Sequence, residues 1–193
     1  MFKLYEQPPE TVTIGEKNYQ LDMTFDRVLI AMDALEDSQM LDADKLEVFL
    51  QLLIRDKLPP VNEWSEAFYR VQEVLDGATA KVMHYDLNGD VIERHSKEVP
   101  DFSFSFDAGY IYAAFRQTYG IDLLAERGKL HWFEFISLFN GLPDETRFNR
   151  IRAIRSVDLS KVKDRDQKAE LREQKRKLAL PDAPDEEGDS YGR

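Results

Sequence analysis

Cysteine is absent from the 193 residues, and histidine occurs only as His84, His95 and His131. The chain therefore forms no disulfide, offers no thiol nucleophile and cannot build a cysteine zinc finger, and three histidines are a poor basis for an imidazole metal cage. No apolar run approaches the roughly 20 residues that span a bilayer, and the opening MFKLYEQPPE lacks the apolar core of a signal peptide. We expect a soluble, cytoplasmic protein with no membrane partner.

Catalytic and cofactor-binding motifs are also missing. The sequence contains no glycine-rich phosphate loop, no GxSxG elbow, no HExxH motif and no kinase-like set. Asp101 and Asp107 could be proposed as an acid and a base, but among 37 acidic residues such proximity is common and usually marks a solvated face or a helix cap. His131 precedes a predicted helix and is better interpreted as its flank than as a general base. We expect a non-enzymatic protein without a cofactor.

A calcium loop is the one metal motif that the sequence superficially suggests, through Asp86, Asn88 and Asp90. An EF-hand requires glycine at position 6 and a bidentate glutamate at position 12. Here glycine stands at position 4 and Lys97 at position 12. We therefore interpret the segment as a β-hairpin with an Asn-Gly turn and predict no metal site.

Charge is distributed unevenly along the chain, whose formal net charge is −11. Residues 1–100 carry 20 acidic and 10 basic side chains, whereas residues 144–180 carry 7 acidic and 12 basic ones. The last segment, 181–193, is acidic again and has too little apolar surface to offset the entropy of ordering, so we expect a disordered tail. The pattern predicts an acidic body, a basic helical stretch and an acidic tail.

Hydrophobic periodicity predicts a mainly α-helical fold with small β-hairpins, which is an α+β class. Hairpins are expected near 11–21, turning at Gly15-Glu16-Lys17, and near 82–95. Apolar spacing and stop signals predict helices over the following segments: 25–35, 46–53 with a cap at Asp42 or Asp44, 61–75 ending at Gly77, 108–119 capped by Asp107 and ended by Gly120, 132–139, 148–154 and 164–180. We expect one compact domain over 1–160, a basic helical arm over 161–180 as an extended C-terminal helix, and the disordered tail.

Aromatic residues concentrate in residues 101–140, which hold 11 of the 22 in the chain. Burial of such side chains is strongly favourable, so this segment should form the centre of the core. We expect Trp132, Phe135 and Phe139 to be structural, since they share one face of a predicted helix.

The basic stretch at 147–177 is the candidate interaction surface. Its candidate partner-binding residues are Arg147, Arg150, Arg152 and Arg155 for charge pairing and Leu171 and Leu178 for docking of the arm. Nucleic acid is disfavoured as a partner because residues 144–180 also hold seven acidic groups and the acidic body repels phosphates. Pairing with an acidic surface of the same chain, of another copy or of a different protein is favoured, and a plain solvated helix without a ligand stays open.

Two runs of the aromatic and basic segments carry a resemblance: DAGYIYAAFRQTYGIDL and LHWFEFISLFNGLPDETRFNRIRAIRSVDLSK. Together with YQLDMTFDRVLIAMDAL near the start, they resemble the bacteriophage Gp-fifteen protein family of tailed phages and prophages of Gram-positive bacteria. The resemblance covers residues 18–76 and 101–178. Phe133, where a second tryptophan is expected, and the hairpin at 82–95 depart from the family pattern.

The resemblance implies a tail assembly chaperone of long-tailed phages (siphophages), which binds and solubilises the tape-measure protein and self-associates as a homo-oligomer. Such a protein would act in the host bacterial cytoplasm and be absent from the mature virion. A structural tail or connector component of the virion is the main alternative, and a nucleic-acid-binding regulator is a weaker one. The resemblance rests on aromatic helix faces, so it indicates a lineage and no catalytic residue.

Overall fold

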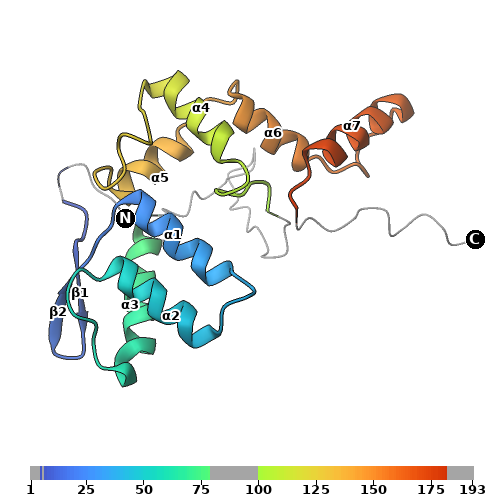
Figure 1. Cartoon of the computed structure of the whole chain (residues 1–193). Helices are drawn as coiled ribbons and strands as arrows, with labels where there is room; N and C mark the ends of the chain where they lie inside the picture. Colours follow the sequence, from blue (N-terminus) through green and yellow to red (C-terminus); the bar gives the residue numbers. More distant parts are fainter. Residues whose placement is uncertain (1–4, 6, 79–99, 182–193) are drawn as a thin grey trace, which may run out of the picture. The chain divides into compact units, whose positions relative to one another are not determined.

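The computed structural model describes residues 5, 7–78 and 100–181 (Figure 1). Over these ranges the protein is mainly α-helical with one two-stranded antiparallel sheet, which confirms the predicted fold class. The chain divides into two compact units. We call residues 1–83 and 121–141 the hairpin unit, and residues 84–120 and 142–193 the arginine unit.

The hairpin unit begins with the predicted hairpin. Strands β1 (Thr11–Ile14) and β2 (Lys17–Gln20) pair so that Ile14 lies opposite Lys17, which leaves Gly15 and Glu16 as a two-residue turn. Gly15 has a φ of 56°, a left-handed conformation that glycine adopts without steric cost. Lys17, expected in the turn, is therefore the first residue of β2.

The helices of the hairpin unit are α1 (Phe25–Glu36), α2 (Asp42–Leu53), the short 3₁₀ helix η1 (Val61–Glu63), α3 (Trp64–Ala78) and α5 (Trp132–Asn140). Helix α1 packs against α2 and α5, and α3 packs against α2, α5 and strand β1. The predicted core residues Trp132, Phe135 and Phe139 are buried, with 1%, 1% and 4% of their surfaces exposed. Phe135 stacks on the rings of Phe25, Trp132 and Phe139, so α5 forms the centre of this core.

The start of α2 differs from the sequence prediction. Neither Asp42 nor Asp44 is the N-cap, because both lie in the first turn and Leu41 precedes the helix without a side-chain cap. Acidic residues in a first turn are still favourable, because they face the positive end of the helix dipole. The helix ends at Leu53, as predicted, because Ile54 leaves it to pair with Leu21.

The arginine unit contains α4 (Ala108–Tyr119), α6 (Arg147–Arg155) and α7 (Arg165–Leu178). Helix α6 packs against both α4 and α7. Gly120 ends α4 as predicted, with a φ of 70°. Phe115 and Phe148 are fully buried in this unit.

Two sequence predictions lie wholly or almost wholly outside the described residues. The hairpin near 82–95 falls within 79–99, and the predicted tail, apart from residue 181, falls within 182–193. The predicted domain limits stay a prediction, because two compact units do not by themselves say which segment folds alone.

Candidate interaction surfaces

Helix α6 carries the four arginines that the sequence marks as partner-binding candidates, and the structure separates them into two pairs. Arg147 and Arg150 are exposed. The guanidinium of Arg147 lies 5.4 Å from the centre of the Tyr110 ring, a cation–π distance. These two side chains present positive charge to solvent and are accessible to a partner.

Arg152 is half-buried and bonded within its own unit. Its Nε and Nη2 lie 3.1 and 3.0 Å from Oδ2 of Asp101, and its guanidinium lies 4.9 Å from the ring centre of Phe102. The ion pair and the aromatic contact hold Asp101 and Phe102, which precede α4, against α6.

Arg155 is buried and forms the ionic centre of the arginine unit. Its Nη1 and Nη2 donate to Oδ2 and Oδ1 of Asp107 at 2.6 and 2.9 Å, and the two side chains are 7% and 0% exposed. Nη1 also donates to the carbonyl of Asp101 at 3.1 Å, and Nε donates to that of Leu178 at 2.6 Å. Arg155 thereby connects the start of α4 and the end of α7 to α6, and its donors serve the fold.

Asp107 is the N-cap residue of α4, as predicted. Its carboxylate makes no capping hydrogen bond, so the expected side-chain cap does not form. The carboxylate accepts instead from Arg155 and from the backbone N–H of Ser103, 3.1 Å away. A buried carboxylate requires such partners because burial of an unpaired charge is very costly. An acid within the apolar run FSFSFDAGYIY was the sequence signal for this pair.

Helix α7, the predicted basic arm, packs on α6 of its own unit. Leu171 and Leu178, the predicted docking residues, are both half-buried, and Nζ of Lys175 donates to the carbonyl of Val157 at 2.9 Å. None of the residues of α7 is fully buried. The arm is therefore docked along one side by a few apolar and polar contacts.

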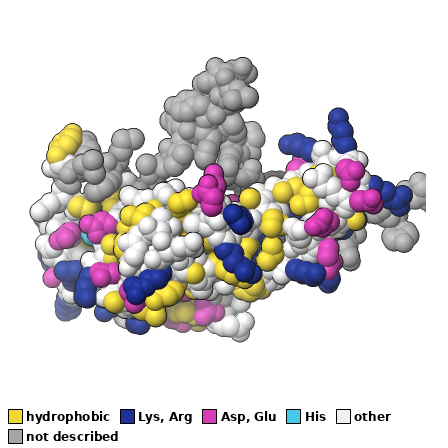
Figure 2. Space-filling model, turned by 90° about the horizontal axis from the view of Figure 1, so that it is seen from above, with side chains coloured by type: hydrophobic (Ala, Val, Ile, Leu, Met, Phe, Trp, Pro, Cys, Tyr) yellow, Lys and Arg dark blue, Asp and Glu magenta, His cyan; other side chains and the backbone are white. Residues whose placement is uncertain are grey.

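The exposed side of α7 is strongly charged. The helix carries six basic and three acidic residues, and Figure 2 shows side chains of both signs crowded together over it. Glu173 pairs with Arg176 and Lys177, and these hydrogen bonds hold the pKa of Glu173 below its usual value. The Glu173–Lys177 pair has the i, i+4 spacing that brings side chains together on a helix surface, and Asp164 caps the helix by accepting from the N–H of Gln167.

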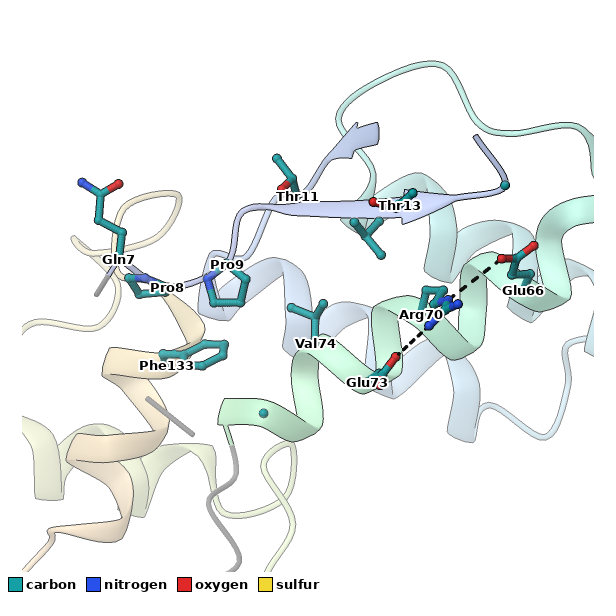
Figure 3. A pocket seen from close by; sticks show the side chains of 13 residues that line it. Gln7, Pro8, Pro9, Thr11, Thr13, Glu66, Arg70, Glu73, Val74 and Phe133 are labelled. Atoms are coloured by element: carbon teal, nitrogen blue, oxygen red, sulfur yellow. Dashed lines mark hydrogen bonds and ion pairs between the residues drawn. The ribbon is translucent and has the colours of Figure 1, made fainter. Parts of the chain in front are cut away.

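A groove in the hairpin unit was not predicted from the sequence. It has a volume of about 560 Å³ and lies between β1 and α3, with Phe133 of α5 at one end (Figure 3). Its charged residues are Glu66, Arg70 and Glu73 of α3, which are exposed and ion-paired through Arg70. No sequence motif marks the groove, because strand and helix are 50 residues apart and meet only in the fold.

His131 is the N-cap of α5. Its Nδ1 accepts from the N–H of Phe133 at 3.2 Å, while its buried Nε2 has no hydrogen-bond partner among the described residues. Burial lowers the pKa of His131, although Glu10 and Glu134 act in the opposite direction. The prediction that this residue flanks the helix is confirmed, and its imidazole has a capping role.

The described ranges contain neither a metal-binding cluster nor a helix that could span a membrane. No group of three or more histidine, aspartate or glutamate side chains there could hold a metal ion. None of the helices in these ranges has the length and apolar composition needed to cross a bilayer.

The fold and these surfaces define a mainly helical protein with exposed cationic helices in one unit and an anionic groove in the other. No curated protein and no solved structure matches the chain. The chain belongs to the family described as Bacteriophage Gp15 protein, whose model matches residues 4–180. This membership confirms the resemblance to the Gp-fifteen family and assigns the chain to the structural and assembly proteins of phages.

Proposed function

We propose that this protein is a non-enzymatic tail assembly chaperone that binds and solubilises the tape-measure protein and associates with further copies of itself. The observation that carries the proposal is the cationic surface, which we define as the exposed Arg147 and Arg150 of α6 with the exposed cations of α7. Arg152 and Arg155 are not part of this surface, because they bind Asp101 and Asp107 within the fold. Family membership supports a role in the phage particle or its assembly.

An ionic surface suits a protein that must cover another molecule and later leave it. Exposed charge pairs are individually worth only about 0–1 kcal/mol, and salt screens them over about 10 Å. Many such contacts along a long cargo give a stable complex together, and each can be broken without a chemical step. A head-to-tail contact that does not close would let copies repeat along a rod.

Co-expression with the neighbouring tape-measure protein tests the proposal. The unmodified chain should bring the tape-measure protein into the soluble fraction and co-purify with it. The double variant Arg147→Glu/Arg150→Glu should lose at least tenfold of the captured cargo, because it reverses the exposed charge of α6. The control is Arg27→Glu/Arg127→Glu, which makes the same change in net charge at exposed arginines of the hairpin unit. Insoluble cargo with the unmodified chain, at several salt concentrations, would contradict the proposal.

The place of action is a second part of the proposal. A chaperone works in the host cytoplasm and is released, so the chain should be absent from purified virions by mass spectrometry. A fixed stoichiometric amount in particles would favour the alternative of a structural tail or connector component.

A further inference from the structure

The two-stranded sheet has two outer edges, and among the described residues the outer edge of β2 is partly covered while that of β1 is not. At the outer edge of β2, the N–H of Arg55 donates to the carbonyl of Gln20 at 2.9 Å, and the N–H of Gln20 donates to Oδ2 of Asp56 at 2.8 Å. The chain after α2 therefore runs beside the end of β2 and satisfies the outward backbone groups of Gln20.

The outer edge of β1 is different. Leu21 donates to the carbonyl of Glu10 at 2.7 Å, so Glu10, Val12 and Ile14 point their backbone groups at β2. By the alternation of an antiparallel ladder, Thr11 and Thr13 point their N–H and C=O groups the other way. Among the described residues, none hydrogen-bonds to these outward backbone groups. Such an edge is a template for another extended chain.

The uncovered edge opens into the groove along α3. The facing residues of that helix are Glu66, Arg70, Glu73, Val74 and Gly77, whose spacing places them on one side (Figure 3). A groove with a strand edge as one wall and a helix as the other is the geometry in which a peptide adds to a sheet. At about 560 Å³ the groove has the size of a binding cleft.

Charge identifies the chemistry of the occupant. Arg70 lies between Glu66 and Glu73, at 3.9 and 3.3 Å, so one cation serves two carboxylates (Figure 3). These carboxylates are 47% and 73% exposed and keep capacity for a further cation. The carboxylate of Glu63 lies beside Gly15 at the turn and adds negative charge.

We propose that the groove binds an extended segment of a partner protein that carries lysine or arginine at alternate positions. The segment adds as a third strand to β1, with backbone hydrogen bonds to Thr11 and Thr13 and with its cations toward Glu66 and Glu73. Alternate positions are required because side chains of a strand point to opposite faces in turn. The inference goes beyond the proposed function and does not depend on the identity of the cargo.

A peptide titration of the full chain tests this binding. The probe is an acetylated and amidated peptide of eight residues that alternates lysine and valine, and its matched control replaces every lysine with glutamate. Backbone amide NMR should show the lysine peptide shifting the signals of Thr11 and Thr13. The glutamate peptide should bind at least tenfold more weakly. Equal binding of the two peptides, or no shift at Thr11 and Thr13, would overturn the proposal.

Two variants separate strand addition from simple charge attraction. Thr13→Pro removes an outward N–H that the hairpin does not use and should weaken binding at least tenfold. Asn18→Pro is the control, because Asn18 lies opposite Thr13 and its outward N–H belongs to the other edge of the sheet. Each of the two changes also removes the hydrogen bond between the Thr13 and Asn18 side chains, so that loss is matched. Glu66→Gln/Glu73→Gln leaves the strand intact and should also weaken binding about tenfold.

Circular dichroism checks that the two proline variants keep the fold, which this comparison requires. The glutamine variant tests the charge of the groove without altering the strand. Unchanged affinity in the glutamine variant would contradict the assigned charge. If sedimentation shows a dimer that Thr13→Pro dissociates, the occupant is a second copy and the proposed partner segment is wrong.

Discussion

The hairpin unit and the arginine unit are stabilised in different ways. The hairpin unit has a core of stacked aromatic and aliphatic side chains, and among its described residues the only buried polar side chain is that of Thr24. The arginine unit buries Asp107 and Thr146 and places a bidentate ion pair among its aromatic residues. Apolar burial depends on volume, whereas a buried ion pair depends on both partners and their geometry. Mutations should therefore be tolerated differently in the two units.

The largest effect is expected in the aromatic core of the hairpin unit. Phe135→Ala should lower the free energy of unfolding by about 3–5 kcal/mol, because it removes a ring that stacks on three others and leaves a cavity. Urea unfolding followed by tryptophan fluorescence measures this loss. Phe135→Leu should cost distinctly less, and equal costs for the two changes would contradict a volume-dependent core.

Breaking the ion pair in the arginine unit should cost about 3 kcal/mol. Arg155→Met leaves the carboxylate of Asp107 buried without its cation. The double variant Arg155→Met/Asp107→Leu should recover much of the lost stability, since no charge then remains unpaired. A double-mutant cycle in urea checks this, and additive losses would show that the pair is not coupled.

Replacing a glycine by alanine should have smaller effects, of opposite sign, at Gly109 within α4 and at Gly120, the C-cap of that helix. Gly120→Ala should destabilise by about 1 kcal/mol, because alanine is strained at a φ of 70°. Gly109→Ala should stabilise by about 0.5 kcal/mol, since alanine is the better helix former and the added methyl meets no atom within 4 Å. Thermal unfolding of both variants measures the two signs, and a loss at Gly109 would contradict the free space there.

The smallest effect concerns pH and the hairpin unit. Because burial lowers the pKa of His131 in the folded chain below its usual 6.5, protonation favours the unfolded chain. The contribution of His131 is complete above pH 6.5 and is lost as the pH falls through the lowered value. His131→Asn keeps a capping acceptor but removes the titration, so stability should decline less between pH 7 and pH 5, whereas His131→Ala should lose about 1 kcal/mol at neutral pH. An identical pH profile for the asparagine variant would exclude His131 as the cause.

The sequence predicted the hairpin unit better than the arginine unit, because the two units are stabilised in different ways. Periodicity located the first hairpin, α1, α3 and α5, because these elements bury one apolar face each. The glycine signal was wrong for α3, since Gly77, expected to end that helix, lies inside it. The Asp107–Arg155 pair escaped prediction because its partners are 48 positions apart, and charge spacing carries no information about such a contact. For that reason four arginines looked alike in the sequence, while only Arg147 and Arg150 are exposed. The groove escaped for a similar reason, because a free strand edge has no composition of its own.

Hydrogen exchange of the complex with the tape-measure protein tests most directly the claim that the arginine unit binds cargo through its cationic surface. The account predicts that binding slows amide exchange in α6 and α7 and leaves α1 and α2 unchanged. Slowed exchange confined to the hairpin unit, or none anywhere in a complex that does form, would contradict it.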